Sequence, residues 1–267
     1  VACLRCTDPV IEGGNPVLVL FRAWSLSRGG LIWAVAGFVA LTANQRFFAE
    51  VTAFYPLSGF AGFVTSVAVL LVCAIAALSA VLSLPLPVRL VLTALLVTSA
   101  LVGHFSDALG IVIDDAMIRN IVRTDAGEAT DLLSSDLALR VLVSGVIPAV
   151  VVWLLPIRRT SVVRRQVGLV AVLGVALLGM AGMIVPQTDA YASFFRTHKS
   201  LRYYTNPTYP LYSLIEYVLA DDSVGGAHAF ETRVSAVTRS DGDYARELVI
   251  VIVGETARAD HFGINGY

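Results

Sequence analysis

Three side chains that could bind a metal lie close together near the end of the sequence. Glu255 follows the apolar run Leu248–Val253, and Asp260 and His261 come soon after it. The run is rich in β-branched residues and does not alternate, which is typical of a central strand of a parallel sheet. Ligands of open α/β sheets bind at the carboxyl ends of strands, and a carboxylate oxygen binds zinc at about 2.0–2.2 Å. Glu255 is therefore a candidate metal ligand; the alternative is a helix cap or an ion pair.

A second set of polar residues has the spacing of one helix face. Asn120, Thr124 and Glu128 are four residues apart, in a segment whose apolar residues also recur at helical spacing. Four residues turn a helix by about 400°, so the three side chains would form a column. Such a column could hold a cationic head group, with the carboxylate facing an ammonium and the others donating to phosphate or ester oxygens. The alternative is an interfacial helix with a solvated face, on which Asp115 and Arg119 form an ordinary ion pair.

The elements that must position these groups are mostly apolar. Of 267 residues 57% are hydrophobic and 15% are charged, against about 25% charged in soluble domains. A bilayer crossing takes about 20 helical residues. The sequence predicts five membrane spans, at 30–43, 59–82, 86–102, 137–155 and 167–185. The net charge of −1 gives no basic field that would indicate a nucleic-acid partner.

The basic residues predict the orientation of the spans. Arginines precede the first span, follow Pro85-Leu86-Pro87 between the second and third, and cluster between the fourth and fifth; they are Arg22, Arg28, Arg89, Arg158, Arg159, Arg164 and Arg165. Arginines concentrate in cytoplasmic loops, so these alternate connections are assigned to the cytoplasm. A charge at mid-bilayer costs about 2.5–3.5 kcal/mol, so Arg89 is expected at a turn or the edge of a span. The acidic loop 104–136 and everything after the fifth span then lie outside, in the periplasm if the host is Gram-negative.

The segment after the fifth span is expected to lie on the membrane surface. Within TDAYASFFRTHKSLRYYTNPTYPLYSLIEYVL, tyrosines and phenylalanines alternate with basic residues, which suits the membrane–water boundary. Asn206-Pro207 breaks the chain, and Pro210 is well placed to begin another helix. We interpret residues 187–245 as an interfacial linker to an outer domain; the alternative is a linker helix with a solvated face. Cys3 and Cys6, in the predicted cytoplasmic tail 1–28, are read as incidental thiols.

The motif GETARADHFGINGY resembles the opening motif of the phosphoethanolamine transferases, lipid A-modifying membrane enzymes of the alkaline phosphatase and sulfatase superfamily. The five spans, the stretch DDAMIRNIVRTDAGEATDLL after the third and FRTHKSLRYYTNPTYP after the fifth resemble the same family. The resemblance implies a five-span helical membrane domain over 29–186. It also implies the first strand of a periplasmic α/β domain, alkaline phosphatase-like and truncated, over 246–267.

The resemblance further implies roles for single residues. Glu255 corresponds to a zinc ligand of the family, and Asn120, Thr124 and Glu128 correspond to residues of its phosphoethanolamine pocket. The reaction implied is transfer of phosphoethanolamine from phosphatidylethanolamine to lipid A, in the bacterial inner membrane. The family's nucleophilic threonine and remaining zinc ligands are expected beyond Tyr267, so the 267-residue polypeptide is expected to be inactive by itself.

Three other functions compete with this one. A glycerol-phosphate transferase of the lipoteichoic acid synthase type resembles the same family, but its donor head group lacks an amine. A transporter or channel would need charged or broken positions within the spans, whereas the charges here lie mostly at loops and edges. The third is a non-enzymatic membrane anchor.

Overall fold

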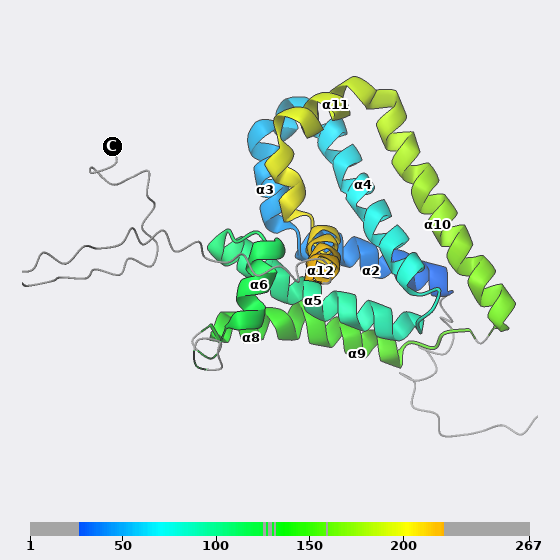
Figure 1. Cartoon of the computed structure of the whole chain (residues 1–267). Helices are drawn as coiled ribbons and strands as arrows, with labels where there is room; N and C mark the ends of the chain where they lie inside the picture. The colour runs from blue at the N-terminus through cyan, green and yellow to red at the C-terminus, as the bar shows by residue number, and fades with distance from the viewer. Residues whose placement is uncertain (1–26, 125–126, 128–129, 131, 159, 222–267) are drawn as a thin grey trace, which may run out of the picture. The chain divides into compact units, whose positions relative to one another are not determined.

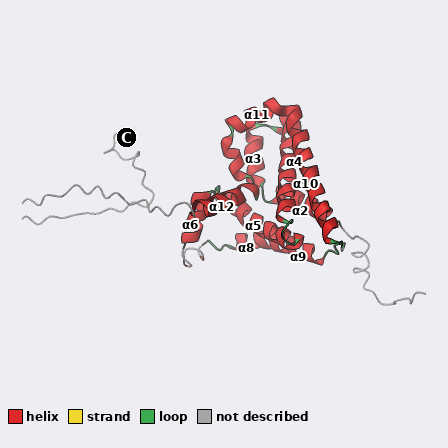
Figure 2. Ribbon diagram, turned by 45° about the vertical axis from the view of Figure 1, so that its right-hand side comes forward, coloured by secondary structure: helices red, strands yellow, loops and turns green. Residues whose placement is uncertain are grey.

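A computed structural model of the protein describes residues 27–124, 127, 130, 132–158 and 160–221. All belong to the first of two units into which the chain divides, Val1–Gly225 and Gly226–Tyr267. The described elements are all helical (Figures 1 and 2). They are α2 (Arg28–Thr42), α3 (Gln45–Phe54), α4 (Leu57–Leu82), α5 (Val88–Leu109), α6 (Asp115–Arg123), α8 (Ser135–Val141), the π-helix η1 (Leu142–Val146), α9 (Ile147–Leu154), α10 (Val162–Ile184), the 3₁₀-helices η2 (Val185–Gln187) and η3 (Lys199–Tyr204), α11 (Thr188–Thr197) and α12 (Thr208–Asp221). The predicted strand Leu248–Val253 and Glu255 lie outside the described residues.

Each of the five predicted spans coincides with a helix. Among the described residues, four are long and apolar enough to cross a membrane: α4, α5, the continuous run from α8 to α9, and the run that begins with α10. The first predicted span corresponds to α2, which is 15 residues long and is followed after a 64° bend by α3. If the bent pair counts as one span, the number is five, as predicted.

The ends of α5 show how local sequence sets the span boundaries. Pro87 is its N-cap and Arg89 lies in its first turn, so this arginine is at the edge of the span, as predicted. The helix continues beyond the predicted end at Val102 to Leu109, where Gly110 adopts φ +66°, a conformation that glycine adopts without strain. The outer loop is therefore shorter than predicted, and Asp107 belongs to the helix.

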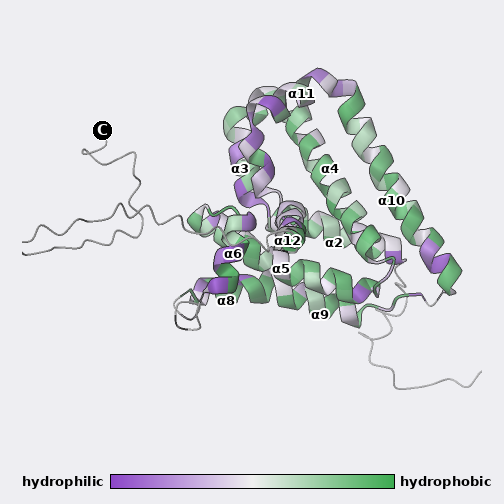
Figure 3. Ribbon diagram, viewed as in Figure 1, coloured by the Kyte–Doolittle hydropathy of each residue, from purple (hydrophilic) through white to green (hydrophobic). Residues whose placement is uncertain are grey.

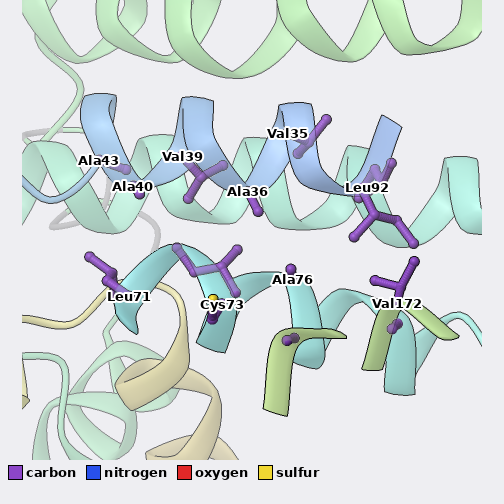
Figure 4. Close-up of a cluster of buried hydrophobic side chains, with 14 of the residues drawn as sticks. Val35, Ala36, Val39, Ala40, Ala43, Leu71, Cys73, Ala76, Leu92 and Val172 are labelled. Atoms are coloured by element: carbon purple, nitrogen blue, oxygen red, sulfur yellow. The ribbon is translucent and has the colours of Figure 1, made fainter. Parts of the chain in front are cut away.

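Small side chains allow the helices of the core to approach closely. Along α2, alanines and valines face α4, α5 and α10 (Figure 4). A Cβ at Gly179 of α10 would lie 2.9 Å from the sulfur of Cys73 on α4, which is too close. Glycine at this position therefore permits the α4–α10 packing, in the way that small residues do between transmembrane helices.

Large apolar side chains cover the outside of the same helices. Leu154 of α9 and Leu178 of α10 are each 74% exposed, and hydrophobic residues cover most of α4, α9 and α10 (Figure 3). An apolar surface of this extent is stable in contact with lipid rather than water.

Charged groups at the bend between α2 and α3 compensate the ends of both helices. Asp107 on α5 accepts a hydrogen bond from the backbone N–H of Arg46, near the start of α3, at 2.9 Å. Arg140 on α8 donates to the carbonyl of Thr42, at the end of α2, at 2.8 Å, and forms an ion pair with Asp107. The anion thus faces a helix N-terminus and the cation faces a helix C-terminus, which is the favourable arrangement with helix dipoles.

We expect Asp107→Asn to lower the free energy of unfolding by about 1–3 kcal/mol, because it leaves a mostly buried arginine without its counter-charge. Asparagine still offers an oxygen to the Arg46 N–H, so the change tests the charge alone. The measurement is unfolding by sodium dodecyl sulfate from neutral detergent micelles. Glu50→Gln is the control, because its pair with Arg46 is more exposed and is worth less than about 1 kcal/mol. Equal, small losses of unfolding free energy in Asp107→Asn and Glu50→Gln would contradict the interpretation that the charge of Asp107 compensates that of Arg140.

Candidate functional site

Two of the three residues predicted to bind a head group lie together at the end of α6. Asp114 caps the start of this helix by accepting from the Met117 N–H at 2.8 Å. At its other end, the Thr124 N–H and hydroxyl both donate to the Asn120 carbonyl, at 2.8 Å each. The side chain of Asn120 is exposed and forms no hydrogen bond with a described residue. Its amide is thus available to a ligand.

The predicted helical column of three side chains is not continuous. The helix ends at Arg123, and Thr124 is extended, with φ −62° and ψ 130°. The sequence Thr-Asp-Ala-Gly that begins there brings no large apolar side chain to prolong the buried face of α6. Glu128 lies outside the described residues, so its place beside Asn120 stays a prediction, as does the head-group role of all three.

Helix α12 packs against α6 and holds its polar face in place. Arg119 of α6 lies over the ring of Tyr217 of α12, 5.9 Å from its centroid. The same guanidinium is 3.7 Å from the Asp115 carboxylate, which is the ion pair expected in the alternative interpretation of this segment. Both partners of this pair are about half exposed, so it contributes little to stability. The contact with α12 therefore does more than the ion pair to fix α6.

Aromatic rings of η3 and α12 form a cluster, and one of them, Tyr209, lies near Asp114 at the start of α6. The ring of Tyr209 is 4.9 Å from that of Tyr203 and 6.1 Å from that of Tyr212. Arg202 lies over Tyr203 at 5.1 Å. Burial raises the pKa of the Tyr209 phenol above its ordinary value, and the nearby Asp114 carboxylate adds to this. A tyrosine phenol is already protonated at neutral pH, and the raised pKa keeps it protonated further into the alkaline range.

A buried network of two asparagines fixes the start of α12. Asn44, at the bend between α2 and α3, donates to the Asn206 carbonyl at 2.9 Å and accepts from its N–H at 2.8 Å. The Asn206 amide donates to the carbonyls of Ser99 on α5, at 2.8 Å, and Ala43, at 3.2 Å. The two asparagines are 1% and 2% exposed. The break predicted at Asn206-Pro207 is thus tied directly to the first and third predicted spans.

An apolar cavity of about 190 Å³ lies beside this network, between α3, α4 and α11. Phe47, Leu71 and Phe194 contribute to its walls, and Arg202 lies at its margin. The hydroxyl of Tyr191, which also lines the cavity, is 2.8 Å from the Ser66 hydroxyl and is thus already paired. The cavity suits a hydrocarbon group, with a cation beside it.

The residue predicted to bind zinc, Glu255, lies outside the described residues, as do the neighbouring Asp260 and His261. The described residues contain no group of three or more His, Cys, Asp or Glu side chains that could hold a metal. The zinc assignment therefore stays a prediction.

Sequence reasoning missed the residues that position the site. Asn44 was not singled out, and Asp107 was assigned only to the acidic loop 104–136, although each is a polar residue next to a long apolar run. That signal could have marked them as buried groups in need of partners. It could not have named Asn206, because 162 positions separate it from Asn44.

Apolar helices that are long enough to cross a bilayer, and that expose leucine and valine over most of their surface, define a helical multi-pass membrane protein. The chain belongs to the phosphoethanolamine transferase EptA/EptB family, whose sequence model matches residues 71–221. This match includes α6, Asn206 and α12.

Relatives and a solved structure agree with this assignment. The chain is 37% identical over 253 residues to phosphatidylethanolamine transferase Mcr-1 of Escherichia coli and 34% identical over 249 residues to Mcr-2 of the same organism. Each match covers 91% of this chain and 46% of the relative, so the chain spans about half the length of these relatives. The fold is similar to that of the integral membrane protein lipooligosaccharide phosphoethanolamine transferase A from Neisseria meningitidis, with a TM-score of 0.68 and 23% identity. That likeness covers 73% of this chain and 37% of the other.

Proposed function

We propose that this chain forms the membrane part of an enzyme that transfers phosphoethanolamine from phosphatidylethanolamine to lipid A. The observation that carries the proposal is the family match over residues 71–221, which spans both Asn120 and the segment anchored by Asn206. The names of the relatives add phosphatidylethanolamine as the donor. Lipid A as acceptor rests on the resemblance of the GETARADHFGINGY motif.

The described geometry supports a head-group site at the outer loop. The free Asn120 amide can donate to phosphate or ester oxygens, and the Thr124 hydroxyl lies within the same turn. Glu128 follows four residues later and supplies the carboxylate that faces the ammonium of the donor. The cavity beside Phe47 and Phe194 suits part of an acyl chain. Together these groups bind both ends of a phospholipid near the membrane surface.

The proposal includes zinc held by Glu255 at the outer face. Zinc would neutralise negative charge on phosphoryl oxygens. The remaining ligands and the threonine nucleophile are expected from the resemblance beyond Tyr267. The proposed location is the inner membrane, with Arg28, Arg89 and Arg165 at the cytoplasmic end of the helices. Adding phosphoethanolamine introduces an ammonium group that makes the surface of lipid A partly zwitterionic, which should weaken its attraction for cationic peptides such as polymyxin.

A chimera tests the proposed function. Residues 1–267 are joined to the part of Escherichia coli Mcr-1 that they do not cover, and lipid A from cells that express the chimera is analysed by mass spectrometry. We expect phosphoethanolamine on lipid A with the chimera and none with the 267-residue polypeptide alone. Lipid A that stays unmodified while a correctly inserted chimera accumulates in the membrane would argue against the proposal.

In the chimera, we expect Glu128→Gln to lower transfer from phosphatidylethanolamine about tenfold or more. The substitution keeps the size of the side chain but removes a charge-assisted hydrogen bond to the ammonium. The rate is measured with donor labelled in the ethanolamine group. Glu50→Gln, which removes a carboxylate already paired with Arg46, should leave the rate unchanged. An unchanged rate in Glu128→Gln would show that this carboxylate does not hold the ammonium of the donor.

A further inference from the structure

A second cavity, lined in part by arginines, lies at the other end of α5 from the outer loop. Its volume is about 500 Å³. It is formed where the start of α2, the α4–α5 turn, the end of α9 and the start of α10 meet, and polar residues interrupt the hydrophobic surface of α10 there (Figure 3). Its lining includes Arg28, Arg89, Arg165, Trp153, Pro156 and Ile157. By the distribution of arginines, this is the cytoplasmic end of the helices.

Three guanidinium groups line this cavity, and no carboxylate of the described residues balances them. Each has a hydrogen bond to a neutral oxygen: Arg28 to the Thr160 hydroxyl, Arg89 to the Leu155 carbonyl at 2.7 Å, and Arg165 to the Leu84 carbonyl at 3.3 Å. No acidic residue in the described part of the chain forms an ion pair with any of them. Because a guanidinium has five N–H donors, each arginine is held in place and keeps donors to spare.

Two of these arginines each have a buried N–H group without a hydrogen-bond acceptor among the described residues. The Nε atoms of Arg89 and Arg165 are buried and form no hydrogen bond with a described residue. Arg89 also lies over the ring of Trp153, 5.6 Å from its centroid, and the indole N–H donates to the Thr93 hydroxyl at 2.9 Å. Tryptophan favours the level of the lipid head groups. The cavity thus presents oriented positive charge at the depth where phosphates lie.

We propose that this cavity binds a phosphate monoanion, either in the head group of an anionic phospholipid or as free phosphate. Guanidinium groups bind phosphate oxygens through paired N–H donors, and basic pockets between helices on the cytoplasmic side bind anionic head groups. With no described carboxylate to face an ammonium, the cavity should select phosphatidylglycerol over phosphatidylethanolamine. The site is therefore distinct from the proposed donor site in both position and charge, and does not depend on it.

Adjacent arginines provide a matched pair of variants. Arg165 lines the cavity, whereas Arg164 is exposed and does not line it. Replacing either by glutamine removes one positive charge from the same turn of α10. The Leu84 carbonyl keeps a donor in Arg165→Gln, because Gln166 also bonds it at 3.0 Å. Circular dichroism checks that each variant keeps its helices, and Arg28→Gln is a second variant from another helix.

The test uses the purified chain in phosphatidylcholine nanodiscs, with phosphatidylglycerol, phosphatidylethanolamine or inorganic phosphate added. Retained lipid is counted by native mass spectrometry, and the midpoint of thermal unfolding is measured. We expect phosphatidylglycerol to be retained and to raise the midpoint, and Arg165→Gln and Arg28→Gln each to weaken this binding about tenfold. Arg164→Gln should bind as the unmodified chain does.

The separate additions distinguish a lipid head group from free phosphate as the ligand. A raised midpoint with inorganic phosphate alone, lost in Arg165→Gln but not in Arg164→Gln, would support the site with free phosphate as its ligand. Equal losses in Arg164→Gln and Arg165→Gln would mean diffuse surface charge and would overturn the proposal. Equal retention of phosphatidylethanolamine and phosphatidylglycerol, with no response to inorganic phosphate, would overturn it as well.

Discussion

Asn44→Ala is expected to lower the free energy of unfolding by about 2–4 kcal/mol. The alanine removes three hydrogen bonds, to the Val39 carbonyl at 3.1 Å and to the backbone carbonyl and N–H of Asn206. Both Asn206 groups then stay buried without a partner, and each such group costs about 1–3 kcal/mol. The total is less than a simple sum of bonds, because segments unfolded within a membrane also find partners.

Unfolding of the variant by sodium dodecyl sulfate measures this loss. Hydrogen exchange at the Asn206 amide should also become faster, because that N–H loses its acceptor. Thr65→Val is the control, because Thr65 is exposed and its hydroxyl donates only to the Ala61 carbonyl of its own helix, at 2.7 Å. A change of less than about 0.5 kcal/mol is expected there. If Asn44→Ala were as mild as Thr65→Val, the asparagine network would not be what anchors α12.

The bend between α2 and α3 organises the outer side of the molecule. Asp107 and Arg140 compensate the two helix ends that meet there, while Asn44 ties the same bend to Asn206. From Asn206 the chain enters α12, and α12 packs against the helix that carries Asn120. Asn44, Asp107 and Asn206 thus link this bend to the helices that carry the proposed head-group site.

The span positions could be predicted from sequence because lipid contact requires long apolar runs. The helices α4, α5 and α10 were placed within a few residues at most ends, and Arg89 lies at a span edge, as its charge requires. The larger departures are the start of α10, at Val162 rather than 167, and the end of α5, at Leu109 rather than 102. The carboxylate of Asp107 indicated a loop, but its partners come from α3 and α8, so its cost is compensated by residues far away in sequence.

Irregular backbone was harder to predict than the spans. The π-helix η1 precedes Pro148, which lacks the N–H that a regular helix needs and would clash with the preceding turn. Within η1, a Cβ on Gly145 would lie 3.2 Å from Ala100 of α5. A hydropathy profile shows η1 and α9 as parts of one uniform apolar span. Pro148 is visible in the local sequence, but the close approach of α5 at Gly145 depends on packing between helices, which local sequence does not contain.

The sequence could predict which residues belong to the candidate site, but not the backbone geometry that places them. Spacing by four correctly brings Asn120 and Thr124 together, because a backbone hydrogen bond joins them. It wrongly extended the helix past Arg123, because periodicity of polar residues does not report where the buried apolar face ends. The head-group role itself came from resemblance, and Glu128 and Glu255 lie outside the described residues.

The second large effect is expected for Glu255→Ala in the chimera with Mcr-1. The proposed role of Glu255 is to hold zinc where phosphoryl transfer takes place, and metal ions contribute several kcal/mol to stabilising such transition states. Each 1.36 kcal/mol corresponds to a factor of ten, so transfer should fall by roughly 100-fold or more. Glu50→Ala is the matched control, since it removes a carboxylate that the proposal does not use.

The most direct test of the central claim measures zinc content and phosphoethanolamine transfer on the same purified chimera. The account predicts bound zinc and active transfer in the unmodified chimera and in Glu50→Ala, with both strongly reduced in Glu255→Ala. Zinc content and transfer that are the same in Glu255→Ala as in the unmodified chimera would contradict it.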